Sequence, residues 1–278
     1  MISPFGSLPV AAGVNLVVFE SAVGPLTAFR APAEGERRGT VLFVHGFTGS
    51  KEDFRLLAPA AARQGWDAVA YTQRGQADSA APIGIDAYRL SFLAADATHI
   101  ADQLAEEVGE GTRIHLVGHS LGGLVARAAV VSSPETFASL TLLCSGPGGR
   151  PGVHQSDGEL VVRRGLLALV GEDDDAFTHE RFAASSVENY LAGVDILQHT
   201  VDVSGDLAAT GVPVLVAHGD TDDAWPIADQ RAMATRLGAR YEVIPNAGHL
   251  PNLDNPKFTT TLLAEFWAST ANSMGGRR

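Results

Sequence analysis

Residues 113–123, which read RIHLVGHSLGG, constrain the fold more than any other part of the chain. The apolar residues 114–117 predict a short buried strand, and the apolar run 124–130 predicts a helix. Between them lies Gly118-His119-Ser120-Leu121-Gly122, a G-x-S-x-G sequence. Strand, tight turn, serine and helix in this order are typical of a nucleophile elbow, whose glycines leave room for a sharp turn. The alternative is an ordinary strand-to-helix turn in which Ser120 caps the helix.

A serine hydroxyl is a weak nucleophile and needs a base within hydrogen-bond reach, which an acid orients. His249 suits this role best among the nine histidines. Residues 240–244 predict a strand, and the turn that ends at His249 follows it directly. Loops at the carboxyl ends of parallel strands are where open α/β sheets carry their chemistry.

The acid is expected before this histidine, after another strand. Residues 212–217 (VPVLVA) predict that strand, and the sequence HGDTDDAWP follows it at 218–226. Three aspartates therefore compete for the role: Asp220, Asp222 and Asp223. Asp220 directly follows a glycine and suits a residue that braces the turn. The sequence pattern alone leaves the choice open.

Strands and helices alternate along most of the chain. Residues 16–20 and 26–31 predict an antiparallel pair. Further predicted strands lie at 40–44, 68–72, 114–117, 140–145, 212–217 and 240–244, with helices at 52–64 and 87–108. This alternation predicts a mostly parallel sheet covered by helices on both faces. The alternation of strands and helices stops at 146–211, where residues 159–170 and 177–191 predict additional helices.

These motifs together resemble the α/β-hydrolase superfamily over nearly the whole chain. Ser120, Asp222 and His249 follow the family order of nucleophile, acid and base. The family pattern H-G-x-x-D-x-x-x-P matches residues 218–226 and places the acid on Asp222, with Asp220 as its rival. The family's N/A-G-H motif matches residues 246–249. A further family motif, D-x-R-G-x-G-x-S, matches residues 72–79 less well, because Thr72 and Ala77 depart from it.

The resemblance implies a fold and a division of the chain. It predicts an eight-stranded, mostly parallel α/β-hydrolase sheet flanked by helices, with a helical cap inserted over the candidate nucleophile. Residues 1–145 and 212–278 are expected to form the core, and residues 146–211 the cap. The alternative for the inserted segment is a set of surface helices without a gating role.

The resemblance also implies an oxyanion hole and a substrate pocket. A developing oxyanion needs two N–H donors. The backbone N–H of Leu121 is one, and in the family the residue after the H-G pair of an earlier loop supplies the other, here Phe47 of His45-Gly46-Phe47. We expect four side chains to line the substrate pocket: Phe47, His119, Trp225 and Leu250.

The function implied is that of a serine hydrolase that cleaves a carboxylic ester or a related acyl substrate through an acyl-enzyme, without cofactor or metal. Thioesterases, lactonases, perhydrolases and C–C bond hydrolases use the same three side chains and remain alternatives. A non-catalytic small-molecule receptor on the same scaffold is the alternative from a different class.

The composition limits the kinds of binding partner that we expect. The 278-residue chain has a net charge of −12, which disfavours nucleic acids and anionic membranes as partners. The sequence has neither an apolar run long enough to cross a bilayer nor a leader pattern, so we expect a cytoplasmic protein. We further expect a monomer or homodimer that acts on a small acyl substrate. Cys144, the single cysteine, lies in an apolar run and predicts a packed thiol.

Overall fold

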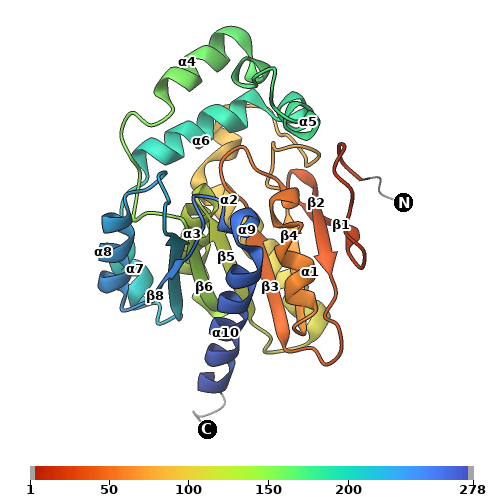
Figure 1. Ribbon diagram of the computed structural model, residues 1–278, viewed down its shortest axis with the longest axis vertical. Helices are drawn as coiled ribbons and strands as arrows, with labels where there is room; N and C mark the ends of the chain where they lie inside the picture. Colours follow the sequence, from red (N-terminus) through yellow and green to blue (C-terminus); the bar gives the residue numbers. More distant parts are fainter. Residues whose placement is uncertain (1–3, 275–278) are drawn as a thin grey trace.

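The computed structural model describes residues 4–274, and its centre is an eight-stranded sheet (Figure 1). The strands lie in the order β1-β2-β4-β3-β5-β6-β7-β8. Their bounds are β1 Asn15–Ser21, β2 Gly24–Ala31, β3 Gly39–Val44, β4 Trp66–Tyr71, β5 Ile114–His119, β6 Phe137–Leu143, β7 Val214–Gly219 and β8 Arg240–Ile244. Strand β2 runs antiparallel to both of its neighbours, and the other neighbouring pairs are parallel. The predicted mostly parallel sheet is confirmed.

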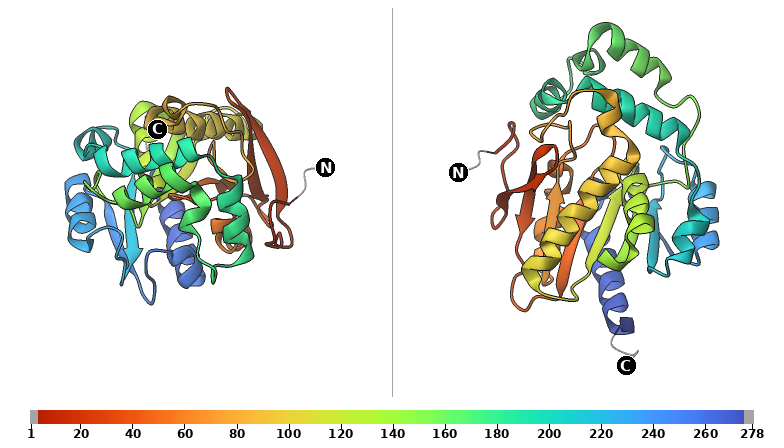
Figure 2. Two further views of the ribbon diagram at one scale, coloured as in Figure 1. Left: turned by 90° about the horizontal axis from the view of Figure 1, so that it is seen from above. Right: turned by 180° about the vertical axis from the view of Figure 1, so that it is seen from behind.

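Helices cover both faces of the sheet. One apolar layer packs α1 (Leu57–Ala62) and α10 (Pro256–Met274) against it. The opposite layer contains α2 (Leu90–Val108), α3 (Leu121–Ser132), α7 (Ser204–Ala209) and α8 (Ile227–Leu237). Figure 2 shows α2 and α3 lying along the back of the sheet. Because both faces are covered, β4 to β7 are buried along their whole length, which explains their continuous apolar runs.

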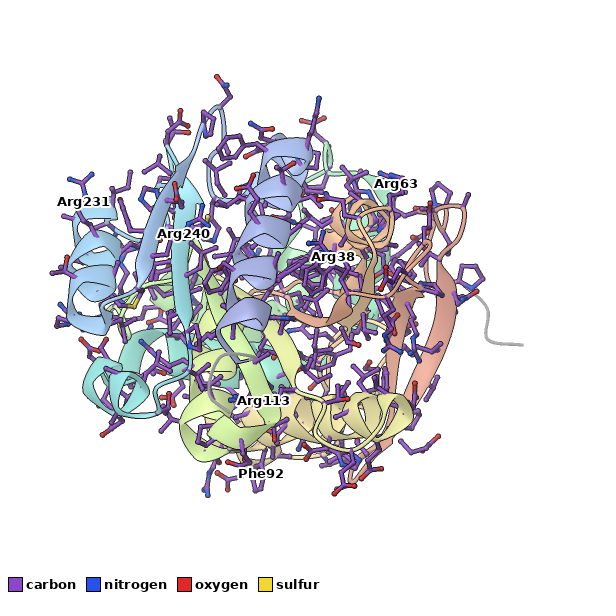
Figure 3. All side chains as sticks on the ribbon, turned by 90° about the horizontal axis from the view of Figure 1, so that it is seen from below. Arg38, Arg63, Phe92, Arg113, Arg231 and Arg240 are labelled. Atoms are coloured by element: carbon purple, nitrogen blue, oxygen red, sulfur yellow. The ribbon has the colours of Figure 1, made fainter. Side chains whose placement is uncertain are left out.

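Residues 146–211, the segment for which the sequence predicts an insertion, contain helices α4 (Gln155–Arg164), α5 (Ala176–Ala184) and α6 (Val187–His199) above the carboxyl ends of the strands (Figure 1). The predicted helix at 177–191 is divided, because Ser185 is extended and Ser186 caps α6 by accepting the Asn189 N–H. The last helix of the segment, α7, packs against α8 in the core layer instead. Arg38 and Arg113, which precede β3 and β5, lie at the other end of the sheet (Figure 3).

Two helices of the core differ from the prediction, one in being divided and the other in where it begins. The helix expected at 52–64 consists of a 3-10 turn, Lys51–Phe54, and the short helix α1. The helix expected at 87–108 begins at Leu90, because a 3-10 turn with buried Tyr88 precedes it and Arg89 is extended. None of the helices within the described residues is long and apolar enough to cross a membrane.

The degenerate motif at 72–79 attaches the inserted segment to the core. The backbone oxygen of Arg74 accepts a hydrogen bond from the Asn189 side chain at 2.9 Å, and the Gly75 oxygen accepts one from the Ser186 N–H at 2.8 Å. The guanidinium of Arg74 in turn binds both carboxylate oxygens of buried Asp96 on α2, at 2.6 Å each. A buried ion pair therefore holds the loop on which α6 rests.

This ion pair yields a stability prediction. Replacing Asp96 by Ala leaves the Arg74 cation buried without its partner, which costs about 3–5 kcal/mol in the free energy of unfolding. Urea unfolding measures the loss. The matched control is Asp86→Ala, because Asp86 pairs with Arg89 at 2.7 Å on the exposed surface, where such pairs contribute about 1 kcal/mol or less. Equal losses in the two variants contradict the prediction.

Candidate active site

Ser120 occupies a strained turn between β5 and α3. Its backbone has φ 54° and ψ −122°, a conformation that residues other than glycine rarely adopt. A Cβ on Gly118 would lie 2.6 Å from the Gly123 Cα, and one on Gly122 would overlap the backbone at the end of β3. The turn therefore requires glycine on both sides of the serine. It places the hydroxyl at the carboxyl edge of the sheet.

A chain of hydrogen bonds joins Ser120, His249 and Asp222. The Nε2 atom of His249 lies 3.0 Å from Ser120 Oγ, and its Nδ1 lies 2.9 Å from Asp222 Oδ1. An ionised carboxylate can only accept, so Nδ1 carries the proton and Nε2 is left as the acceptor for the serine hydroxyl. The structure thus brings together the three residues that the sequence proposed, from positions up to 129 residues apart.

The environment of Asp222 keeps its carboxyl ionised. Burial acts to raise its pKa, but hydrogen bonds from His249 and Gln230 outweigh burial, and the pKa is held below its ordinary value. Gln230, fully buried on α8, donates to Asp222 Oδ2 at 2.8 Å, and the Ala224 N–H donates to Oδ1. Sequence reasoning missed Gln230, because a glutamine on a helix carries no motif.

The two competing aspartates have other contacts. Asp220 is exposed, and its carboxylate accepts the backbone N–H groups of Asn246 and Ala247 at 3.0 and 3.1 Å. These bonds lower its pKa and fasten the turn that carries His249. Asp223 lines the cavity described below. Of the three aspartates, Asp222 contacts the imidazole.

The loop after β3 lies directly against the serine turn. A Cβ on Gly46 would come within 3.0 Å of the Ser120 Cβ, so glycine allows Phe47 to approach the serine. His45 is fully buried, and burial lowers its pKa to about 4. Its neutral ring accepts the Gln73 N–H at 3.0 Å and braces the loop. Phe47 and Leu121 thus belong to the two segments that meet at Ser120.

His119 fixes the backbone of His249. Its Nε2 donates to the His249 carbonyl oxygen at 2.7 Å, and burial lowers its pKa to about 4, so the ring is neutral. Buried Cys144 lies nearby, and burial raises the pKa of its thiol. His119, Cys144 and His249 form the one described group of potential metal ligands, within 4.8 Å of one another. Both nitrogens of His249 already bind Ser120 and Asp222, so this group fits acid–base chemistry better than metal binding.

A cavity of about 810 Å³ opens onto Ser120 and His249. Its lining includes the four side chains expected there, namely Phe47, His119, Trp225 and Leu250. The inserted segment forms the opposite wall with Arg150, Val153, His154, Asp175, Phe177, Thr178, Arg181 and Leu197. Arg181 of α5 reaches Asp53 of the core at 2.9 Å, and the ring of Phe47 contacts that of Tyr190 of α6 in a tilted arrangement, with the ring centres 4.7 Å apart. Core and insertion therefore enclose the cavity together.

Fold and site define an α/β-hydrolase arrangement: a serine on a strained turn, a histidine and an acid at the carboxyl edge of a parallel sheet. A family model described as "Alpha/beta hydrolase family" matches residues 41–260, and the chain belongs to this family.

Its relatives differ in activity. A putative 2-succinyl-6-hydroxy-2,4-cyclohexadiene-1-carboxylate synthase of Bacillus subtilis is 23% identical, over 82% of this chain and 90% of that protein. A pimeloyl-[acyl-carrier protein] methyl ester esterase of Methylococcus capsulatus is 32% identical, over 56% of this chain and 71% of that protein. Several relatives have hydrolase names. The crystal structure of a thermophilic esterase from Thermogutta terrifontis has a TM-score of 0.75 and 21% identity, covers 92% of this chain and 99% of its own, and shows the shared fold.

The buried histidines predict how stability depends on pH. Burial lowers the pKa of His45 and His119 to about 4 and that of His115 to about 3, whereas an unfolded chain has histidine pKa values near 6.5. Below pH 6.5 the unfolded chain therefore binds more protons than the folded one. The free energy of unfolding should fall as the pH decreases from about 6.5 to about 4, by up to about 1.4 kcal/mol per pH unit for each histidine.

Urea unfolding at pH 7.5, 6 and 5 measures this slope. His115→Asn removes one of the three groups and should make the slope shallower. His99→Asn on the exposed face of α2 is the matched control and should leave the slope unchanged. A free energy of unfolding that is flat between pH 6.5 and 4.5 contradicts the prediction.

Proposed function

We propose that this protein is a serine hydrolase that cleaves carboxylic esters or related acyl substrates through an acyl-enzyme. The observation that carries the proposal is His249, with Nε2 3.0 Å from Ser120 Oγ and Nδ1 2.9 Å from Asp222 Oδ1. Ser120 attacks the acyl carbonyl, and His249 takes its proton. Asp222 orients the imidazole and stabilises its cationic form.

The second half of the reaction uses the same groups. His249 gives its proton to the departing alcohol, then takes a proton from the water that attacks the acyl-enzyme and passes it to Ser120 Oγ as the acid leaves. The backbone N–H groups of Leu121 and Phe47 bind the oxyanion in both steps. The close approach of Gly46 to the Ser120 Cβ supports this role for Phe47, because it leaves the loop after β3 beside the attacking hydroxyl.

The substrate class follows from the cavity and from a relative. A volume of about 810 Å³ suits a small molecule, since ligand pockets span roughly 300–1,000 Å³. The methyl ester esterase and the enol-lactonase among the relatives support an oxygen ester as the bond that is cleaved. In this proposal residues 146–211 form the cap, which excludes water and shapes the acyl pocket. The contacts of Arg181 and Phe47 across the cavity support that role.

The first test is covalent labelling with a fluorophosphonate. We expect one adduct, located on Ser120 by peptide mass spectrometry, and none in Ser120→Ala. His249→Ala should slow the labelling by several orders of magnitude, because the hydroxyl loses its base. Labelling of His249→Ala at the wild-type rate contradicts a base-activated serine. A panel of p-nitrophenyl esters then measures turnover, and a labelled protein that hydrolyses none of them contradicts the ester assignment.

The second test compares two aspartates in the same turn. Asp222→Asn should lower kcat by about 10⁴, the loss known for the acid of a Ser-His-Asp triad, because the amide favours the wrong imidazole tautomer. Asp220→Asn keeps one acceptor oxygen for the turn and should lower kcat by no more than about tenfold. Steady-state ester hydrolysis measures both. If Asp220→Asn is the more impaired variant, Asp222 is not the orienting acid.

A further inference from the structure

The chain before β1 contributes a side chain to the cavity that opens onto Ser120. Leu8 lines this cavity and is half-buried. It belongs to residues 5–8, which we call the N-terminal arm. The arm lies next to α5, beyond the edge of the sheet (Figure 1). The wall of the cavity therefore has a third source, besides the ends of the strands and residues 146–211.

The N-terminal arm is attached closely to α5. The Ser7 N–H donates to Glu180 Oε2 at 2.6 Å, and the ring of Phe5 meets that of Phe177 edge-on, with the ring centres 5.9 Å apart. Gly6 has φ 67°, and a Cβ there would lie 2.8 Å from the Phe177 ring. Only glycine fits where the arm crosses this ring, because the position combines a positive φ with a close approach.

The N-terminal arm also rests on the core. The ring of Phe5 lies over the ammonium group of Lys51, with Nζ 5.5 Å from the ring centre. A cation over the face of an aromatic ring is attractive. Lys51 is fully buried and forms ion pairs with Asp78 at 2.6 Å and Glu52 at 3.0 Å, which fix its position. Phe5 therefore links α5 to the core, and the arm is held on two sides.

These contacts hold Leu8 at the α5 side of the cavity. Two residues of extended chain span at most about 7 Å, so Leu8 stays close to Gly6 and to the Phe177 ring that Gly6 touches. Leu8 and Phe177 both line the cavity. Their side chains are apolar, and an apolar wall suits the hydrocarbon part of a substrate.

Three charged side chains on this side of the cavity already have partners. Arg181 pairs with Asp53 at 2.9 Å, and Asp175 accepts the Thr178 N–H at 2.7 Å. All four residues line the cavity. Because these charges are balanced within the protein, they do not call for a charged substrate group. The apolar surface of Leu8 is then the feature that a neutral chain meets.

We propose that Leu8 limits the length of the hydrocarbon chain, acyl or alkyl, that an ester substrate can place in the cavity. This inference rests on the proposed function and adds a specificity-determining residue to it. Each methylene group buried before the chain reaches Leu8 raises kcat/KM about fourfold, and methylene groups beyond that length add nothing. Since the arm positions Leu8, contacts on α5 determine which esters fit.

Two series of esters test the proposal: p-nitrophenyl esters of straight-chain acids, and acetates of straight-chain alcohols. In the parent protein kcat/KM should rise with chain length and level off at a limiting length in at least one series. Leu8→Trp should shorten that limit by about two carbons and so lower kcat/KM at the parent's limit about tenfold, relative to the two-carbon ester. Leu8→Ala should lengthen the limit. Leu56→Ala, exposed and outside the cavity lining, is the control and should keep the parent profile.

Gly6→Ala tests the N-terminal arm without changing Leu8. The added Cβ pushes the arm away from Phe177, so the limit should lengthen, as in Leu8→Ala. Gly13→Ala is the matched control. Gly13 also has a positive φ, 79°, but an added Cβ would have no described atom within 4 Å beyond its chain neighbours. This control should keep the parent profile.

A limiting length that both Leu8 variants leave unchanged in both series overturns the proposal. Leu8→Ala and Gly6→Ala decide the question if Leu8→Trp does not fold. If the parent protein hydrolyses no ester, the proposed function fails instead. Calorimetric titration with 2-alkanones of increasing length, which need no cleavage, then decides the role of Leu8. A limiting length for binding that moves in the Leu8 variants supports that role, and absent binding or an unchanged limit overturns it.

Discussion

The close approach of backbone to backbone around Ser120 is the constraint on which the rest of the structure depends. Gly118 of β5 lies against the first turn of α3, and Gly122 of α3 lies against the end of β3, so neither has room for a side chain. This contact forces Ser120 into its positive φ and points its hydroxyl away from the sheet. The strain is tolerated because apolar layers on both faces fix β5 and α3 in place. In a looser turn the hydroxyl would have no fixed position relative to the other strands.

Several independent contacts likewise fix the position of His249. Three separate contacts hold its loop: Asp220 accepts two backbone N–H groups, His119 donates to the His249 carbonyl, and Asp222 accepts from the ring. The two aspartates lie in the turn after β7, and His119 ends β5 and immediately precedes Ser120. The turn that orients the serine therefore also orients the histidine. The geometry of the site is thus determined by the turns at the carboxyl ends of the strands.

Sequence reasoning predicted the sheet, Ser120 and His249 because these have local signatures, whereas only the family pattern chose Asp222 among three aspartates. Apolar runs of five or six residues give the buried strands, and glycines with fixed spacing give the turn at Ser120. The helix predicted at 177–191 is divided in the structure, because the break at Ser185 and Ser186 depends on contacts with the distant loop at Gly75 and Ala77. Gln230 and Arg127 were not found, because their importance lies in what they contact across the fold.

These distant contacts also determine how the inserted segment is attached. Helix α6 is bound to the core by buried hydrogen bonds at Arg74 and Gln76 through Asn189, and Arg127 holds the residues where the segment begins. Helices α4 and α5 bury fewer side chains, and α5 reaches the core across the cavity through Arg181. Separating α6 from the core leaves several buried polar groups unpaired, whereas separating α5 breaks the Arg181–Asp53 ion pair, the hydrogen bond from the Ser7 N–H to Glu180 and the ring contact of Phe177 with Phe5. Helix α6 is therefore the part of residues 146–211 that buries the most side chains and forms buried hydrogen bonds with the loop at 74–76.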